Sequence, residues 1–149
     1  MRILIIAITL VVTAMSCINP PEYSEIPEIS DATVDRTEAT PGEDSIVVEF
    51  KFQDGDGDLG NKERDSTINA YLVDARTGFP YNYQIPYISE RGNNRAISGT
   101  IWITVDPFTF NCRPNRPDKD TLAYEIYIVD RAGNESNRLT TPPIILDCP

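Results

Sequence analysis

The sequence contains no histidine, and this absence excludes most common enzyme chemistry. None of the 149 residues is His, three are Cys and one is Trp. Histidine is the usual general base near neutral pH and a frequent zinc ligand, so most triad and zinc mechanisms have no residue to perform them. Paired carboxylates could still act as they do in glycosidases, but so small a domain leaves little room for a deep cleft. We therefore expect a protein that is not an enzyme.

Basic residues are also scarce. Lys and Arg number 13 against 23 Asp and Glu, which gives a net charge of −10 at pH 7. A surface of this sign repels phosphate-rich partners, so we expect no nucleic-acid partner. Any attachment to a membrane must come from lipid and not from charge.

The sequence also lacks an apolar run long enough to cross a membrane. Its most apolar stretch, residues 3–12, follows Arg2. As a helix this stretch and its neighbours span at most about 20 Å, against a hydrocarbon core of about 30 Å. Small and polar residues come next, in the layout of a secretory signal. We interpret residues 1–16 as a signal peptide, with a spanning helix as the alternative.

The stretch TAMSC, which ends at Cys17, resembles a bacterial lipobox, in which that cysteine becomes the lipidated first residue. Ala14 stands where leucine is usual, so ordinary secretory cleavage is the alternative. Lipidation explains the odd number of cysteines, because Cys112 and Cys148 can then pair in an oxidising compartment; two unpaired thiols are the alternative. Residues 17–28, rich in Pro and Glu, would form an extended tether to one domain at 29–149.

No segment of that domain has a helical period of ten or more residues. Short runs rich in β-branched and aromatic residues alternate instead with turn residues, which indicates strands. The runs are 33–36, 45–53, 68–75, 81–88, 97–105, 122–130 and 141–148. Seven such strands predict an all-β fold, an immunoglobulin-like antiparallel β-sandwich. We expect 122–130 to be central, 141–148 to be an edge strand because it begins with two prolines, and Trp102 to pack within its sheet.

The strand order expected for this fold determines which loops meet. The loops 54–67 and 131–137 would lie at one end, with Asp130 close to the first of them. Cys112 and the end of the last strand would lie at the other end. A Cys112–Cys148 disulfide is therefore geometrically reasonable, and would stabilise the fold by about 3–4 kcal/mol through loop closure.

The stretch QDGDGDLGNKERD, residues 53–65, concentrates acids at alternate positions. Asp54, Asp56 and Asp58 match positions 1, 3 and 5 of an EF-hand loop, and the glycines between them let the carboxylates converge. Glu63, Asp65 and Asp130 are further candidate ligands. The glycine of the sharp turn is displaced by one place and a strand precedes the loop, so this is not an EF-hand. Calcium is the predicted ligand; a fully solvated loop and another cation such as magnesium are the alternatives.

The run GFPYNYQIPY, residues 78–87, offers a second candidate site. Phe79, Tyr81 and Tyr83 alternate along a probable strand, and Tyr87 extends the row. Aromatic residues at this spacing can form a flat platform for a glycan. Cross-strand packing explains the same pattern, and we favour it.

The signal with its cysteine, the Pro/Glu tether, FKFQDGDGDLG and YIVDRAGNESN together resemble a group of small Bacteroidetes-type lipoproteins. The resemblance implies an immunoglobulin-like protein anchored by lipid to the outer membrane, on its periplasmic or outer face. It also resembles proteins that are O-glycosylated at triplets such as Asp44-Ser45-Ile46 and Asp120-Thr121-Leu122. We expect a structural or protein-interaction domain with an unknown protein or glycan partner, and a carbohydrate-binding accessory module as the alternative.

Overall fold

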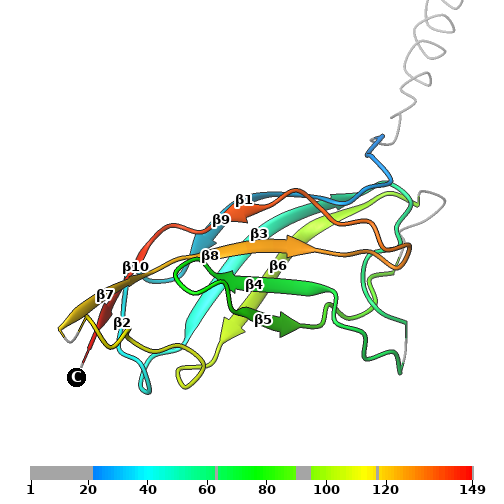
Figure 1. The fold of residues 1–149 in the computed structure, drawn as a ribbon. Helices are drawn as coiled ribbons and strands as arrows, with labels where there is room; N and C mark the ends of the chain where they lie inside the picture. The colour runs from blue at the N-terminus through cyan, green and yellow to red at the C-terminus, as the bar shows by residue number, and fades with distance from the viewer. Residues whose placement is uncertain (1–21, 63, 90–94, 117, 149) are drawn as a thin grey trace, which may run out of the picture.

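The computed structural model describes residues 22–62, 64–89, 95–116 and 118–148. These residues form β-strands without any helix, and the strands pair mainly antiparallel (Figure 1), so the predicted all-β sandwich is confirmed. Within the described ranges no helix could span a membrane. The predicted signal peptide and the lipidation site Cys17 lie outside the described residues.

Three sheets make up the fold. The strands are β1 (Glu28–Val34), β2 (Glu38–Ala39), β3 (Ile46–Asp54), β4 (Ala70–Asp74), β5 (Pro80–Tyr83), β6 (Ile97–Val105), β7 (Lys119–Leu122), β8 (Tyr124–Ile128), β9 (Leu139–Thr140) and β10 (Ile144–Asp147). One layer has the order β1-β3-β6 and the other β5-β4-β8-β9. A small third sheet, β2-β10-β7, continues the sandwich at the end where the chain terminates (Figure 1).

Strict alternation of apolar residues explains why β3 lies at the centre of its sheet. Its buried face is formed by Ile46, Val48, Phe50 and Phe52, and the next buried position is Asp54. The partner β6 pairs with β3 over its whole length, from Ile46–Val105 to Asp54–Ile97. A carboxylate therefore continues an apolar stripe at the end of the strand.

The same pattern recurs in β8, which lies between β4 and β9 and is central, as predicted. Its core-facing residues Tyr124, Ile126 and Ile128 are followed by the buried Asp130. Because β3 and β8 both end at the same end of the sandwich, they bring Asp54 and Asp130 toward the loop 54–67.

Several details differ from the sequence-based expectations. The first strand begins at Glu28, not near residue 33, and the run predicted at 81–88 forms a strand only at Pro80–Tyr83, which is β5. The last strand is not an edge, because β10 lies between β2 and β7 and its prolines precede it. Trp102 is 63% exposed on the outer face of β6 and is not packed in the core. The immunoglobulin-like strand order stays a prediction.

Candidate metal centre

The loop that follows β3 folds back on the sandwich around one apolar anchor. The side chain of Leu59 is fully buried in the core. Its backbone N–H donates to Oδ2 of Asp54 at 2.9 Å, which closes a tight turn over residues 54–59. The sequence DGDGDL therefore curls into a compact loop because its last residue is apolar and its first is a core-facing aspartate.

Glycines supply the conformations that this curl requires. Gly57 and Gly60 have φ angles of 71° and 87°, in the left-handed region that favours glycine. A Cβ atom on Gly60 would lie 2.2 Å from the carbonyl oxygen of Pro86, so no side chain fits there. The next residue, Asn61, is buried and donates its backbone N–H to the carbonyl of Ile85 at 3.0 Å. The loop is thus held against the segment that follows β5.

The three aspartates of this loop converge on one point. One carboxylate oxygen from each of Asp54, Asp56 and Asp58 lies within 4.8 Å of the other two. Oδ1 of each residue is buried and has no hydrogen-bond partner among the described residues. Asp54 as a whole is 0% exposed. Such uncompensated buried acceptors cost free energy, and their convergence is what a bound cation would compensate.

The electrostatics of the aspartate cluster agree with this geometry. Burial raises the pKa of Asp54 to about 6. The hydrogen bond from Leu59 opposes this rise, whereas repulsion from Asp56 and Asp58 adds to it. Burial also raises the pKa of Asp58, with repulsion from Asp130 as the next cause. Among the described residues, no ion pair reaches the three loop carboxylates. The cluster therefore holds excess negative charge.

Arg131 is a residue of this site that the sequence analysis missed. Its backbone N–H donates to the carbonyl of Asp58 at 3.3 Å, and its guanidinium donates to the carbonyl of Gly60 at 2.6 Å. The guanidinium also lies 5.8 Å from the ring centre of Tyr87. Arg131 thus holds the turn after β8 against the acidic loop through backbone carbonyls. Its positive charge offsets only part of the rise in the pKa of Asp58.

The remaining predicted ligands do not join the cluster of three. Asp65 is turned away: its Oδ1 accepts hydrogen bonds from the N–H and the hydroxyl of Thr67, at 2.9 and 2.6 Å, which lowers its pKa. Asp130 is close enough for its charge to raise the pKa of Asp58, but its two oxygens accept from the backbone and side-chain amides of Asn134. Glu63 lies outside the described residues.

The donor set fits calcium. Calcium takes six to eight oxygen ligands at about 2.3–2.6 Å, so two ligands of one ion lie up to about 5 Å apart, as here. Magnesium usually keeps several waters and takes only one or two carboxylates. Three carboxylates in a loop rich in glycine, with carbonyls nearby, therefore favour calcium, whose charge would replace the missing partners of Asp54, Asp56 and Asp58.

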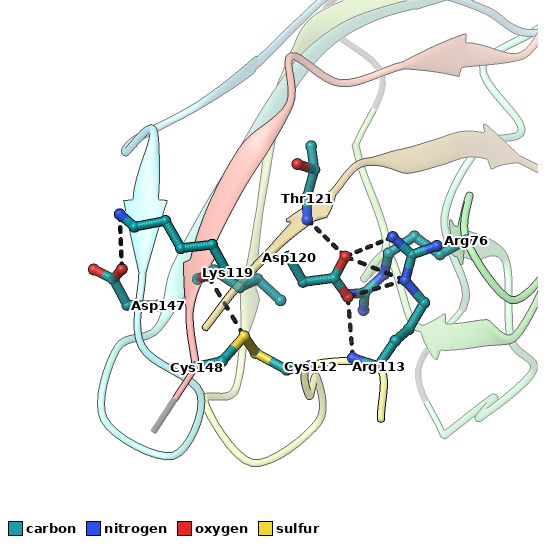
Figure 2. Close-up of a disulfide and its surroundings, with 9 residues drawn as sticks. Arg76, Cys112, Arg113, Lys119, Asp120, Thr121, Asp147 and Cys148 are labelled. Atoms are coloured by element: carbon teal, nitrogen blue, oxygen red, sulfur yellow. Dashed lines mark hydrogen bonds and ion pairs between the residues drawn. A yellow bond between two sulfur atoms is a disulfide. The ribbon is translucent and has the colours of Figure 1, made fainter. Parts of the chain in front are cut away.

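Buried aspartates at the opposite end of the sandwich have partners of their own. The side chain of Arg76 is 7% exposed and bridges Asp74 and Asp120, at 2.7 and 2.8 Å. Arg113 also pairs with Asp120, as Figure 2 shows. The hydrogen bond from Arg113 is the main reason why the pKa of Asp120 lies far below its usual value.

The Cys112–Cys148 disulfide lies beside this ion-pair network (Figure 2), as the sequence analysis predicted. The Cα atoms are 6.0 Å apart, within the usual range for a disulfide. The bond ties the 106–118 connection to the end of β10. Of the two glycosylation triplets, Thr121 is exposed and Ser45 is half-buried.

The four aromatic residues of the second candidate site do not form one exposed row. Tyr81 and Tyr83 are half-buried and pack against the core, Tyr81 with its ring edge-on to Tyr124 at 6.0 Å. Phe79 and Tyr87 are 60% and 52% exposed, but Tyr87 faces Arg131 at the loop end. These contacts agree with the packing interpretation of the aromatic run.

The fold and the site together define a disulfide-bonded all-β sandwich with a cluster of converging aspartates at one end. Comparison with protein-family models, with curated proteins and with solved structures gives no match for this chain.

Proposed function

We propose that this protein is a calcium-stabilised interaction domain, not an enzyme, and that it is displayed outside the cytoplasm on a lipid anchor. The observation that supports the calcium site is the set of three buried, unpartnered Oδ1 atoms on Asp54, Asp56 and Asp58. An acidic cluster alone would be weak support. The complete burial of Asp54 makes solvation by bulk water a poor substitute for a cation.

Calcium at this point would make one rigid unit of the loop end. It would cancel the repulsion within the loop, and Arg131 already links that loop to the turn after β8. Rigid loops at the end of a sandwich are the usual place for binding surfaces. The ion therefore has a structural role here, and a partner would meet a pre-organised end of the domain.

Two features support export and anchoring. The Cys112–Cys148 disulfide is typical of an oxidising compartment, and the N-terminal signal with Cys17 supplies a lipidation site. The order β1-β3-β6 opposite β5-β4-β8-β9 supports an immunoglobulin-like domain. An outer-membrane location follows from the resemblance stated above.

Thermal unfolding in EDTA and in millimolar calcium tests the proposal. Calcium at 100 times its dissociation constant should add about 2.7 kcal/mol to the free energy of unfolding. Asp56→Asn should lose this gain, because the substitution removes a charged ligand. Asp65→Asn is the matched control, since the carboxylate of Asp65 accepts from Thr67 and lies outside the cluster of three, and it should keep the gain. Equal melting temperatures with and without calcium would refute the calcium site.

A further inference from the structure

The chain that enters the domain passes directly over the acidic loop. We call residues 22–27 the N-terminal arm. In Figure 1 this arm, at the blue end of the described chain, meets the end of the sandwich where the loop after β3 lies. The carbonyl of Ser24 in the arm accepts a hydrogen bond of 2.7 Å from the backbone N–H of Gly55.

The arm and the loop approach each other more closely than a side chain would allow. A Cβ atom on Gly55 would lie 2.3 Å from the carbonyl oxygen of Tyr23 and 2.6 Å from that of Ser24. Gly55 stands between Asp54 and Asp56, two of the three converging carboxylates. The same peptide units therefore position two candidate calcium ligands and dock the arm.

The rest of the N-terminal segment is held independently of the aspartates. Glu28 pairs with Gln53 at the start of β1, and their side chains are hydrogen-bonded at 2.7 Å. The backbone of Ile29 exchanges two hydrogen bonds with the side chain of Asn137, at 2.8 and 2.9 Å. These contacts hold the start of β1 in place when the arm is displaced.

We propose, resting on the calcium site proposed above, that cation binding docks the N-terminal arm onto the acidic loop. Without the ion, Asp54 and Asp56, which flank Gly55, repel each other and open the loop. This opening weakens the hydrogen bond from the Gly55 N–H to the carbonyl of Ser24. With the ion, the two carboxylates are drawn together and Gly55 is fixed beneath the arm. Calcium thereby controls whether the arm is held against the domain.

Thermodynamic linkage makes this coupling reciprocal. If calcium strengthens docking of the arm by some factor, then the docked arm must strengthen calcium binding by the same factor. Gly55→Ala is the variant that disrupts docking, because it keeps all three carboxylates while its added Cβ would displace Tyr23 and Ser24. Gly78→Ala is its control: Gly78 lies in the turn between β4 and β5, with nothing within 4 Å of an added Cβ, and the substitution there strains only that turn.

The experiment measures docking of the arm on the full chain in detergent. Glu-C protease cleaves after Glu25 in the arm and after Glu43, an exposed turn residue at the opposite end, and mass spectrometry quantifies both products. We expect calcium to slow cleavage after Glu25 about tenfold relative to Glu43. Hydrogen exchange of the Gly55 amide should slow in parallel. Gly55→Ala should abolish the protection and weaken calcium affinity by a similar factor, while Gly78→Ala should change neither.

The outcomes separate the two proposals. Absence of calcium binding in the unmodified chain overturns the calcium site and this inference with it. Calcium binding with unchanged cleavage after Glu25 and unchanged exchange at Gly55 overturns the coupling alone. Calcium affinity that is the same in Gly55→Ala as in the unmodified chain also overturns the coupling.

Discussion

Each end of the sandwich carries an aspartate where the alternation of a strand would place an apolar residue. At the disulfide end, Asp120 lies on the buried face of β7 and is held by Arg76 and Arg113. At the loop end, Asp54 lies on the buried face of β3, and its Oδ1 has no partner among the described residues. The two carboxylates share a type of position and differ in their neighbours.

The difference shows that a buried aspartate can either form ion pairs within the fold or remain available to bind a cation. At the disulfide end, Arg76 and Arg113 form ion pairs with the buried aspartates, so these carboxylates already have cationic partners. At the loop end, the guanidinium of Arg131 donates to backbone carbonyls instead of the aspartates. We therefore expect the stability of the disulfide end to be insensitive to calcium and EDTA, and that of the loop end to depend on the ions and the pH.

The largest effect should come from removing the internal cation of the disulfide end. Arg76→Ala leaves Asp74 and Asp120 buried with reduced compensation, which should lower the free energy of unfolding by about 3–5 kcal/mol. Urea denaturation measures it, and the loss should be equal in EDTA and in calcium. Arg36→Ala is the control: Arg36 forms a partly exposed pair with Asp44 and should cost less than about 1 kcal/mol. If Arg76→Ala lowered the free energy of unfolding as little as Arg36→Ala, Arg76 would not be compensating the buried aspartates of the disulfide end.

The disulfide should rank next. Replacing both Cys112 and Cys148 with alanine should lower the free energy of unfolding by about 3–4 kcal/mol. The reason is that the unfolded chain regains the conformational entropy lost when a link joins residues 36 positions apart. The stabilisation by calcium should be unchanged, since the ion-binding loop lies at the other end. If the calcium effect disappears together with the disulfide, the two ends are not independent.

Neutralising one aspartate at each end should give effects of opposite sign in EDTA. Asp120→Asn removes an acceptor of several arginine hydrogen bonds and should cost about 2–3 kcal/mol. Asp54→Asn removes a buried charge that lacks a partner and should stabilise the protein by about 1 kcal/mol. In calcium, Asp54→Asn should instead be destabilising relative to the unmodified chain. Two losses of similar size in EDTA would contradict this interpretation.

The pH dependence in EDTA should also differ in sign between the ends. Asp54 has a pKa of about 6 when folded and 3.8 as a reference, so the free energy of unfolding should fall as pH rises from about 4 to 6. The pKa of Asp120 is lowered by folding, so its contribution is present above pH 3.8 and is lost as the pH falls below that value.

Urea denaturation between pH 3 and 8 in EDTA checks both signs. Asp54→Asn should remove the fall between pH 4 and 6 and leave the loss at low pH intact. Saturating calcium should also remove that fall in the unmodified chain, because the ion takes the place of the proton. A stability that rises through this pH range in EDTA would contradict the assignment of Asp54 as an uncompensated carboxylate.

The spacing of residues alone predicted much of this molecule. Alternation located β3 and β6 to within a residue, and cysteine parity with the expected strand order identified the Cys112–Cys148 pair. The three alternating aspartates were found because short spacing with glycines allows only a local curl. The approach of Asp130 followed from knowing which loops share an end of the sandwich.

Side-chain partners distant in sequence could not be predicted in the same way. Arg76 meets Asp120 across 44 residues, and Arg131 reaches Gly60 across 71, so only the folded topology brings them together. Tyr81 and Tyr83 alternate as a surface platform would, yet this face of β5 turns toward the core. Residues 22–27 look like a tether by composition, but Pro27 is buried and Ser24 bonds to the loop.

The most direct test of the account is calorimetric titration of the chain with calcium, alongside Asp56→Asn and Asp65→Asn. We expect one calcium site per chain in the unmodified protein and in Asp65→Asn, with calcium affinity greatly weakened in Asp56→Asn. Magnesium should bind more weakly than calcium. Absence of binding heat at millimolar calcium, with no change in unfolding, would mean that the buried oxygens of Asp54, Asp56 and Asp58 are tolerated without a cation, and would contradict the central claim.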